Sequence, residues 1–217
     1  MAPARTVLLL LLASAFGVVE AAVVVGLRHI ADPTGAGQNA LVPLPPGLLR
    51  LEQVREAATL VLLVSAAGLA GSSRLARAAA FLVLFGVWDL VYYLVLRLVL
   101  GWPARLTDWD VLFLLPVPWY APVYAPVVVA ATMLGCGLVV LHEIHSRGAF
   151  EVRAVHVAGV AAGALAILAS FILPGLRAVE RDAYWLAPLV AGEVLGLVAF
   201  AGAWRRTRRI AGRPAGR

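Results

Sequence analysis

Four carboxylates lie inside apolar stretches of this sequence, where acidic residues are rare. Glu20, Glu56, Asp89 and Glu193 each fall within a different stretch. At a helical rise of about 1.5 Å per residue, they lie roughly 10 to 16 Å from one end of the helices that these stretches would form. A carboxylate at that depth in a bilayer costs on the order of 2 to 3 kcal/mol on insertion scales, so we expect the four acids to face a shared polar interior.

Polar partners accompany these acids at helical spacing. Asp89, Tyr93 and Arg97 recur every four residues, which predicts that they line one face of a helix. Arg55 adjoins Glu56, and Asp110 follows shortly after the stretch that holds Asp89. The candidate substrate- or ion-binding residues are Glu20, Arg55, Glu56, Asp89, Tyr93, Arg97, Asp110 and Glu193.

A purely structural role for these residues is the alternative. Glutamate–arginine pairs inside a helical bundle can fix the register of the helices without binding any substrate. The excess of acids over arginines at depth and the interleaved aromatic residues favour a functional site. Both interpretations stay open at this point.

The histidines form a second, weaker pattern. His142 and His145 are three residues apart at the end of one apolar stretch, and His156 opens the next. This spacing would allow a shared metal ion. Histidine is equally at home at a membrane interface because it is polar, and this second interpretation is the more economical.

Signatures of known chemistry are otherwise missing from the sequence. It has no GxSxG, Walker, HExxH or GxGxxG motif and no Glu-x-x-His pairs beside the buried acids. Its single cysteine, Cys136, lies in an apolar stretch and has no CxxC partner, so we interpret it as a small core residue. No cofactor is indicated.

The composition excludes an ordinary soluble domain. Hydrophobic residues make up 62% of the 217 residues and charged residues 14%, with a mean hydropathy of +0.92. Apolar runs of about 20 residues match a bilayer core of about 30 Å. We therefore predict an all-α integral membrane protein, a bundle of about six transmembrane helices. The predicted spans are Thr6–Leu27, Leu49–Gly71, Ala78–Leu100, Val111–Leu141, Val155–Leu173 and Tyr184–Trp204.

The fourth span is interrupted by prolines. Pro116, Pro118, Pro122 and Pro126 fall within eleven residues, and each removes a backbone donor and disfavours helix in the residue before it. We expect a broken or re-entrant segment to about Pro122 and a regular helix after it. An interfacial loop anchored by aromatic residues is the alternative.

The arginines predict the orientation. All 18 basic residues are arginine, and placing both termini in the cytoplasm puts eleven of them inside, namely residues 5, 74, 77, 147, 153, 205, 206, 208, 209, 213 and 217. We expect one transmembrane domain over residues 1–204 and a basic cytoplasmic tail over residues 205–217 that binds anionic lipid headgroups. The scattered arginines do not suggest a nucleic-acid partner, although the net charge is +6.

The N-terminal stretch resembles a signal peptide as well as a span. Ala13-Ser14-Ala15 is similar to a cleavage site, but the apolar run continues to Leu27, which favours an uncleaved first helix. The absence of lysine, with abundant alanine, glycine, valine, leucine and arginine, is typical of GC-rich bacterial genomes. The expected location is therefore the bacterial cytoplasmic membrane.

Three functions fit these observations. The favoured one is a transporter or channel-like protein in which the outward-facing acids handle protons, cations or a small polar solute. With six spans, such a protein is expected to form a homo-oligomer. The alternatives are a membrane enzyme that acts on a lipid or lipid-linked substrate through Asp89, Asp108 and Asp110, and a structural or assembly subunit.

Overall fold

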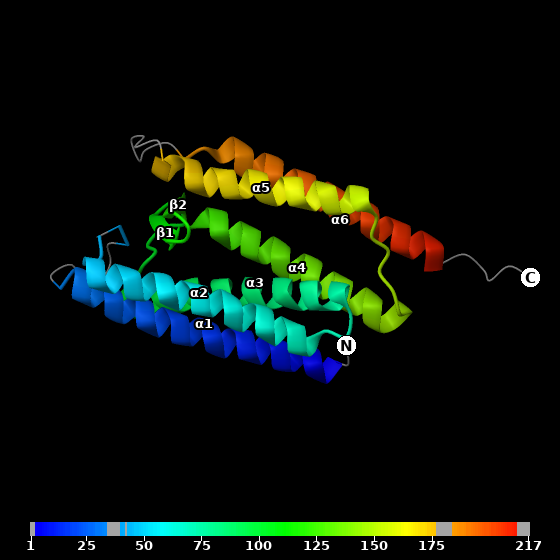
Figure 1. Ribbon diagram of the computed structural model, residues 1–217, viewed down its shortest axis with the longest axis horizontal. Helices are drawn as coiled ribbons and strands as arrows, with labels where there is room; N and C mark the ends of the chain where they lie inside the picture. The colour runs from blue at the N-terminus through cyan, green and yellow to red at the C-terminus, as the bar shows by residue number, and fades with distance from the viewer. Residues whose placement is uncertain (1–2, 34–39, 42, 177–183, 212–217) are drawn as a thin grey trace, which may run out of the picture.

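The computed structural model is a bundle of long helices with one short β-hairpin (Figure 1). It describes residues 3–33, 40–41, 43–176 and 184–211. Both termini lie at the end opposite the hairpin, so we refer to a hairpin end and a terminal end. The elements are α1 (Pro3–Ala31), α2 (Pro46–Ala70), α3 (Arg74–Leu100), β1 (Trp109–Phe113), β2 (Trp119–Pro122), α4 (Tyr124–Arg147), α5 (Ala154–Leu176) and α6 (Leu186–Ala211).

Each predicted span corresponds to one long helix. All six helices are long and apolar enough to cross a membrane, which fits a multi-pass membrane protein. α1 runs without a break through Ala13-Ser14-Ala15. Local sequence accounts for several helix ends: Pro46 lies in the first turn of α2, the Ser73 hydroxyl accepts a hydrogen bond from the N–H of Ala76 at the start of α3, and Gly101 follows α3 with a φ of 67°.

The proline-rich part of the fourth span forms the hairpin. β1 and β2 pair antiparallel, with Asp110 opposite Ala121 and a bulge between Val111 and Phe113. The strand residues are mostly aromatic or apolar, and such residues favour strands, while the prolines prevent a helix before α4 begins at Tyr124. The predicted break to about Pro122 is confirmed, and its conformation is a two-stranded sheet.

The helices form two groups. α3 is central to the first group, since it packs on α1, α2 and α4. In its most apolar 18-residue part, 56% of the residues are buried inside the protein. α5 and α6 pack mainly on each other, and only 17% of the residues in the corresponding part of each helix are buried. The second group therefore lies beside the first and shares its apolar core mainly toward the terminal end, through Ala203, Phe200 and Trp204 of α6 (Figure 1).

Contacts at both ends of the bundle join the groups. At the hairpin end, the Trp119 ring of β2 lies 6.4 Å from the Phe171 ring of α5, measured between centroids. At the terminal end, the indole N–H of Trp204 in α6 donates to Glu143 Oε1 of α4 at 2.8 Å, and the Phe150 and Phe200 rings lie 5.9 Å apart. Between these two ends, the groups leave a space.

The basic tail begins inside α6. The helix continues to Ala211, so Arg205, Arg206, Arg208 and Arg209 are helical, while Arg213 and Arg217 lie outside the described residues. Arginine is a good helix former, and the Thr207 hydroxyl accepts a hydrogen bond from the backbone N–H of Glu151 at 2.8 Å. The helix therefore extends beyond Trp204, where the sequence placed the end of the span.

Close packing of α5 on α6 depends on Gly163. A Cβ at this position would lie 2.6 Å from the carbonyl oxygen of Gly192 and 3.0 Å from the backbone nitrogen of Gly196. We therefore expect Gly163→Leu to separate the two helices and to lower the free energy of unfolding by about 1 to 3 kcal/mol. The melting temperature of the purified protein in detergent measures this effect.

Gly135→Leu is the matched control for this prediction. Gly135 lies on an exposed part of α4, and a Cβ there would have no neighbour within 4 Å. Its substitution should leave the melting temperature close to that of the parent. Equal melting temperatures for both variants would contradict the close packing of α5 on α6.

Candidate functional site

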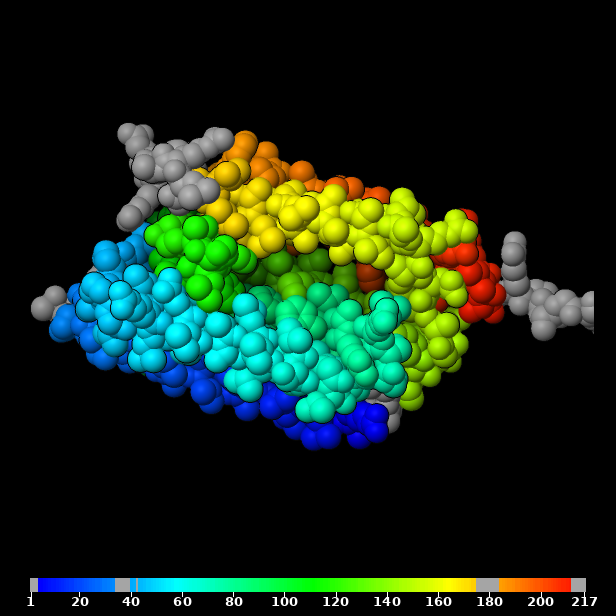
Figure 2. Space-filling model, in the orientation of Figure 1, coloured from blue at the N-terminus to red at the C-terminus, as the bar shows by residue number. Residues whose placement is uncertain are grey.

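A cavity of about 1030 Å³ lies between the two groups of helices. It extends from Arg28 and Asp110 at the hairpin end to Phe150 and His156 at the terminal end. The space-filling view shows the molecule hollowed between α2 and α5 (Figure 2). Most of the lining side chains are apolar, and the charged ones gather toward the hairpin end. The cavity is therefore amphipathic, with a polar end and a long apolar part.

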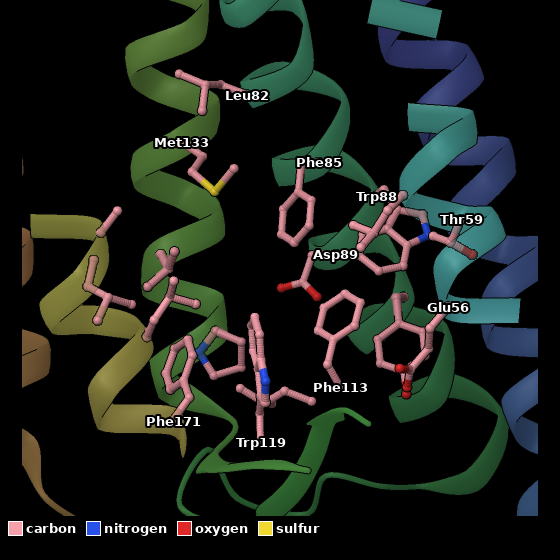
Figure 3. Close-up of a pocket in the computed structure, with 18 of the residues that line it drawn as sticks. Glu56, Thr59, Leu82, Phe85, Trp88, Asp89, Phe113, Trp119, Met133 and Phe171 are labelled. Carbon is pink, nitrogen blue, oxygen red and sulfur yellow. The ribbon is translucent and has the colours of Figure 1, made fainter. Parts of the chain in front are cut away.

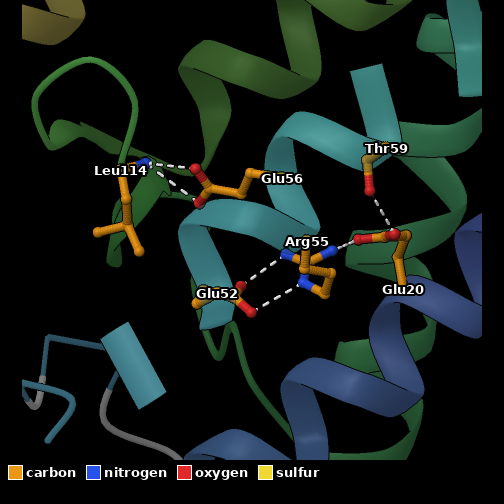
Figure 4. Close-up of polar contacts among 6 residues, drawn as sticks. All are labelled: Glu20, Glu52, Arg55, Glu56, Thr59 and Leu114. Carbon is orange, nitrogen blue, oxygen red and sulfur yellow. Dashed lines mark hydrogen bonds and ion pairs between the residues drawn. The ribbon is translucent and has the colours of Figure 1, made fainter. Parts of the chain in front are cut away.

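Three of the acids near this end are neutralised by arginine. Arg55 donates to both carboxylate oxygens of Glu52, through Nε at 2.8 Å and Nη2 at 2.5 Å, and also forms an ion pair with Glu20 (Figure 4). The Thr59 hydroxyl donates to Glu20 Oε1 at 2.7 Å. Glu52, Arg55 and Thr59 of α2 thus face Glu20 of α1, and the charges of these residues are balanced within an α1–α2 network. The third neutralised acid, Asp110, belongs to the hairpin.

Asp110 fastens the hairpin to α1 and α3. Its Oδ1 lies 3.1 Å from Arg28 Nη2, and its Oδ2 accepts a hydrogen bond from the Tyr93 hydroxyl at 2.9 Å. Burial raises the pKa of the Asp110 carboxyl, while Arg28, Tyr93 and the N–H of Val111 each lower it. The Arg28 guanidinium also lies 3.8 Å from the centre of the Trp102 ring. We call the contacts among Asp110, Arg28 and Tyr93 the hairpin clamp.

Glu56 holds the other side of the hairpin. The backbone N–H of Leu114, which follows β1, donates to both oxygens of Glu56 at 2.8 and 3.1 Å (Figure 4). A carboxylate of α2 therefore satisfies a backbone donor that the turn cannot satisfy with a strand partner. Glu56, which the sequence indicated as a substrate-binding candidate, has a structural partner here.

Asp89 differs from these acids. Its side chain is 9% exposed and projects into the cavity among aromatic rings (Figure 3). Within the part of the chain that the structure describes, its buried Oδ2 has no hydrogen-bond partner. Tyr93, one turn away on α3, donates to Asp110 and not to Asp89. Asp89 therefore brings a carboxylate oxygen without a hydrogen-bond partner among the described residues into the aromatic part of the cavity.

Glu193 lines the cavity from the other group of helices. The Thr132 hydroxyl of α4 donates to Glu193 Oε2 at 2.8 Å, and Oε1 is buried without a partner among the described residues. Cys136 also lines the cavity, so the single cysteine borders the candidate site and is not only a core residue.

Other predicted residues lie outside the site. Arg97 is exposed and donates to the carbonyl oxygen of Gly101. Its side chain is rotated roughly 80° from that of Asp89, because the two residues are eight positions apart on the helix. Asp108 accepts the backbone N–H groups of Ala104 and Arg105 at 2.7 and 3.0 Å and does not line the cavity. Asp108 therefore does not join Asp89 and Asp110, which both line the cavity.

The histidines do not assemble a metal site. His142 and His145 are exposed on α4, and the Nδ1 atom of His156 accepts the backbone N–H of Arg153 at 3.2 Å. Among the described residues, no group of three or more His, Cys, Asp or Glu side chains could hold a metal ion. The spacing that allowed a shared metal in the sequence is not matched in space.

Aromatic residues are the part of the site that the acids did not indicate. Phe85 and Trp88 of α3 line the cavity together with Phe113, Trp119 and Phe171. The spacing Phe81, Phe85, Trp88, Tyr92 is a helical aromatic stripe, and this signal could have found the α3 part. The contributions of the hairpin and α5 depend on tertiary contacts.

Comparisons with protein-family models, curated proteins and solved structures gave no match to this chain. The function is therefore inferred from the site itself.

The hairpin clamp gives a prediction of stability. Asp110→Leu would leave the buried guanidinium of Arg28 without its acid and the Tyr93 hydroxyl without its acceptor. We expect a loss of about 3 to 5 kcal/mol in the free energy of unfolding, because an unpaired buried charge is costly. Equilibrium unfolding of the purified protein in mixed micelles measures it.

Two further variants test the cause of that loss. Arg97→Leu removes an exposed arginine and should change stability little. The double variant Arg28→Met/Asp110→Leu removes both buried charges, so it should recover part of the loss. If Asp110→Leu is as stable as Arg97→Leu, the clamp does not hold the hairpin.

Proposed function

We propose that this chain is a multi-pass protein of the bacterial cytoplasmic membrane with both termini in the cytoplasm. The six apolar helices and the excess of arginine at the terminal end support this placement. Arg205, Arg206, Arg208 and Arg209 on the last turns of α6 would then meet anionic lipid headgroups. The hairpin end, with its acids, would lie at the outer surface.

We further propose that the cavity binds an amphipathic molecule, a lipid or lipid-linked compound, that enters sideways from the bilayer. The observation that carries this proposal is the cavity itself, about 1030 Å³ in volume, apolar along most of its length and hollowed between α2 and α5 (Figure 2). That volume is at the upper end of the range for small-molecule sites. An opening between two membrane-spanning helices would face acyl chains.

The polar end of the cavity is suited to a headgroup. Asp89 and the acids of the α1–α2 network line that end, while α5 supplies mainly apolar residues such as Val160, Ala164 and Leu168. Because Asp108 and Asp110 are engaged in holding the loop and the hairpin, neither is free to share acid–base chemistry with Asp89. Binding or transfer of an amphiphile is therefore better supported than catalysis.

Cross-linking of a phospholipid tests this proposal. The protein is reconstituted in vesicles that contain a phospholipid with a photoreactive diazirine on its acyl chain, and the labelled peptides are identified by mass spectrometry. We expect labelling of Met133, which lies at the cavity wall on α4. Ala164→Trp should decrease this labelling several-fold because the indole fills part of the cavity.

Ala162→Trp is the matched control. Ala162 lies on α5 two residues away, is exposed and does not line the cavity, so its substitution should leave the labelling of Met133 unchanged. Labelling that is confined to outer helix faces, or that is the same in both tryptophan variants, would contradict binding inside the cavity.

Transfer of protons or cations is a second candidate function. Asp89 and Glu193 line the same cavity from different groups of helices, and each has a buried oxygen without a hydrogen-bond partner among the described residues. Ionisable groups of this kind inside a membrane protein mark proton and ion pathways. The apolar walls toward the terminal end weigh against a continuous polar path.

Proton flux into liposomes checks this second candidate. With an imposed potassium diffusion potential and a pH-sensitive dye inside, the parent protein should acidify the vesicles faster than empty vesicles. Asp89→Asn and Glu193→Gln should each lower the flux at least about tenfold, because each removes an ionisable group. Arg97→Met, outside the cavity, should not. Equal rates for the parent and for empty vesicles would exclude proton transport.

A further inference from the structure

The surroundings of Asp89 indicate the kind of headgroup that the cavity takes. The side chain is about nine-tenths buried, and its carboxyl group points into the cavity between the rings of α3 and those of the hairpin (Figure 3). Neither cavity arginine is available to it in this structure, since Arg28 is paired with Asp110 and Arg55 with Glu20 and Glu52. A buried carboxylate without a cation attracts one from a ligand.

The charges of the lining also select for a cation. Six acids line the cavity against two arginines, namely Glu20, Glu52, Glu56, Asp89, Asp110 and Glu193 against Arg28 and Arg55. With the charges of both arginines balanced by acids, an anionic headgroup would meet an excess of carboxylates and be repelled. A cationic headgroup would find the Asp89 carboxylate, while the positive charges of the two lining arginines are already balanced by Asp110, Glu20 and Glu52.

The aromatic rings favour an organic cation over a metal ion. The Phe85 and Trp88 rings lie 5.2 Å apart, Trp88 and Phe113 6.4 Å, and Phe113 and Trp119 5.3 Å, all between centroids. All four line the cavity around Asp89 (Figure 3). Ring faces attract ammonium groups, above all quaternary ones whose methyl groups also contact the rings. A metal ion would need several oxygen ligands, which this arrangement does not supply.

We propose that Asp89 and the surrounding rings of Phe85, Trp88, Phe113 and Trp119 bind the ammonium group of an amphiphile whose alkyl chain occupies the apolar part of the cavity. This proposal rests on the proposed binding of an amphiphile and specifies its headgroup. The ammonium group forms an ion pair with Asp89 and cation–π contacts with the rings, while the chain lies along α4 and α5.

Three probes with one chain length test the headgroup. Photoreactive hexadecyl compounds with a trimethylammonium, a sulfate or a neutral maltoside headgroup are added to the full-length protein in nanodiscs, and labelling of Met133 is followed against probe concentration. We expect saturable labelling by the ammonium compound and at least about tenfold weaker apparent affinity for the other two.

Asp89→Asn tests the residue. The substitution keeps the shape of the side chain and removes its charge. It should therefore lower the apparent affinity for the ammonium compound at least about tenfold and leave the affinity for the maltoside compound unchanged. Asp108→Asn is the matched control, since it neutralises an acid that does not line the cavity and should leave the affinity for the ammonium compound unchanged. Melting temperatures near that of the parent confirm that both variants are folded.

The outcomes separate this inference from the proposed function. If all three compounds label the cavity equally and Asp89→Asn does not change this labelling, the cavity binds amphiphiles but has no site for an ammonium group. If none of them labels Met133, the proposed function fails as well.

The composition of the nanodisc distinguishes two sources of the ammonium group. Weaker labelling in phosphatidylcholine nanodiscs than in phosphatidylglycerol nanodiscs, after correction for the amount of probe in each bilayer, supports a choline phospholipid of the bilayer as the ligand. Equal labelling in both supports a single-chain amine, because the bilayer lipid then does not compete.

Discussion

The ion pair between Arg28 and Asp110 is the contact on which the rest of the structure depends. A proline-rich segment cannot form a helix, so its backbone and its one buried acid need partners from elsewhere. Arg28 of α1 and Tyr93 of α3 supply them for Asp110, and Glu56 of α2 supplies one for the backbone of Leu114. With the hairpin held in this way, β2 presents Trp119 to Phe171 and keeps α5 at a distance from α2.

The cavity follows from that distance. α5 and α6 pack closely on each other and are joined to the other helices chiefly at the two ends of the bundle. Side chains as small as Ala161 and Ala164 face the space between, so it is not filled. In a bilayer, such a space would hold either lipid chains or a ligand with similar chains, because water is unfavourable against apolar walls.

The acids of the site divide into two kinds. Glu20, Glu52 and Asp110 are paired with arginine and Glu56 with a backbone N–H, so substitution of these residues will report on folding as much as on function. Asp89 and Glu193 keep a buried oxygen without a partner among the described residues. A buried polar atom without a partner costs free energy, and a ligand that supplies the partner recovers it. This difference is the reason for proposing a role in binding for Asp89.

The sequence by itself determined the six long helices, the break before Pro122 and the gathering of the acids at one end, because these follow from apolar length, proline chemistry and helical spacing. Only the tertiary structure decided which acids are neutralised, since Arg28 and Asp110 are 82 residues apart. It also placed Arg97 outside the site and Trp119 in the cavity that Asp89 lines. The rotation of a long helix and the position of a hairpin depend on packing partners that local spacing does not specify.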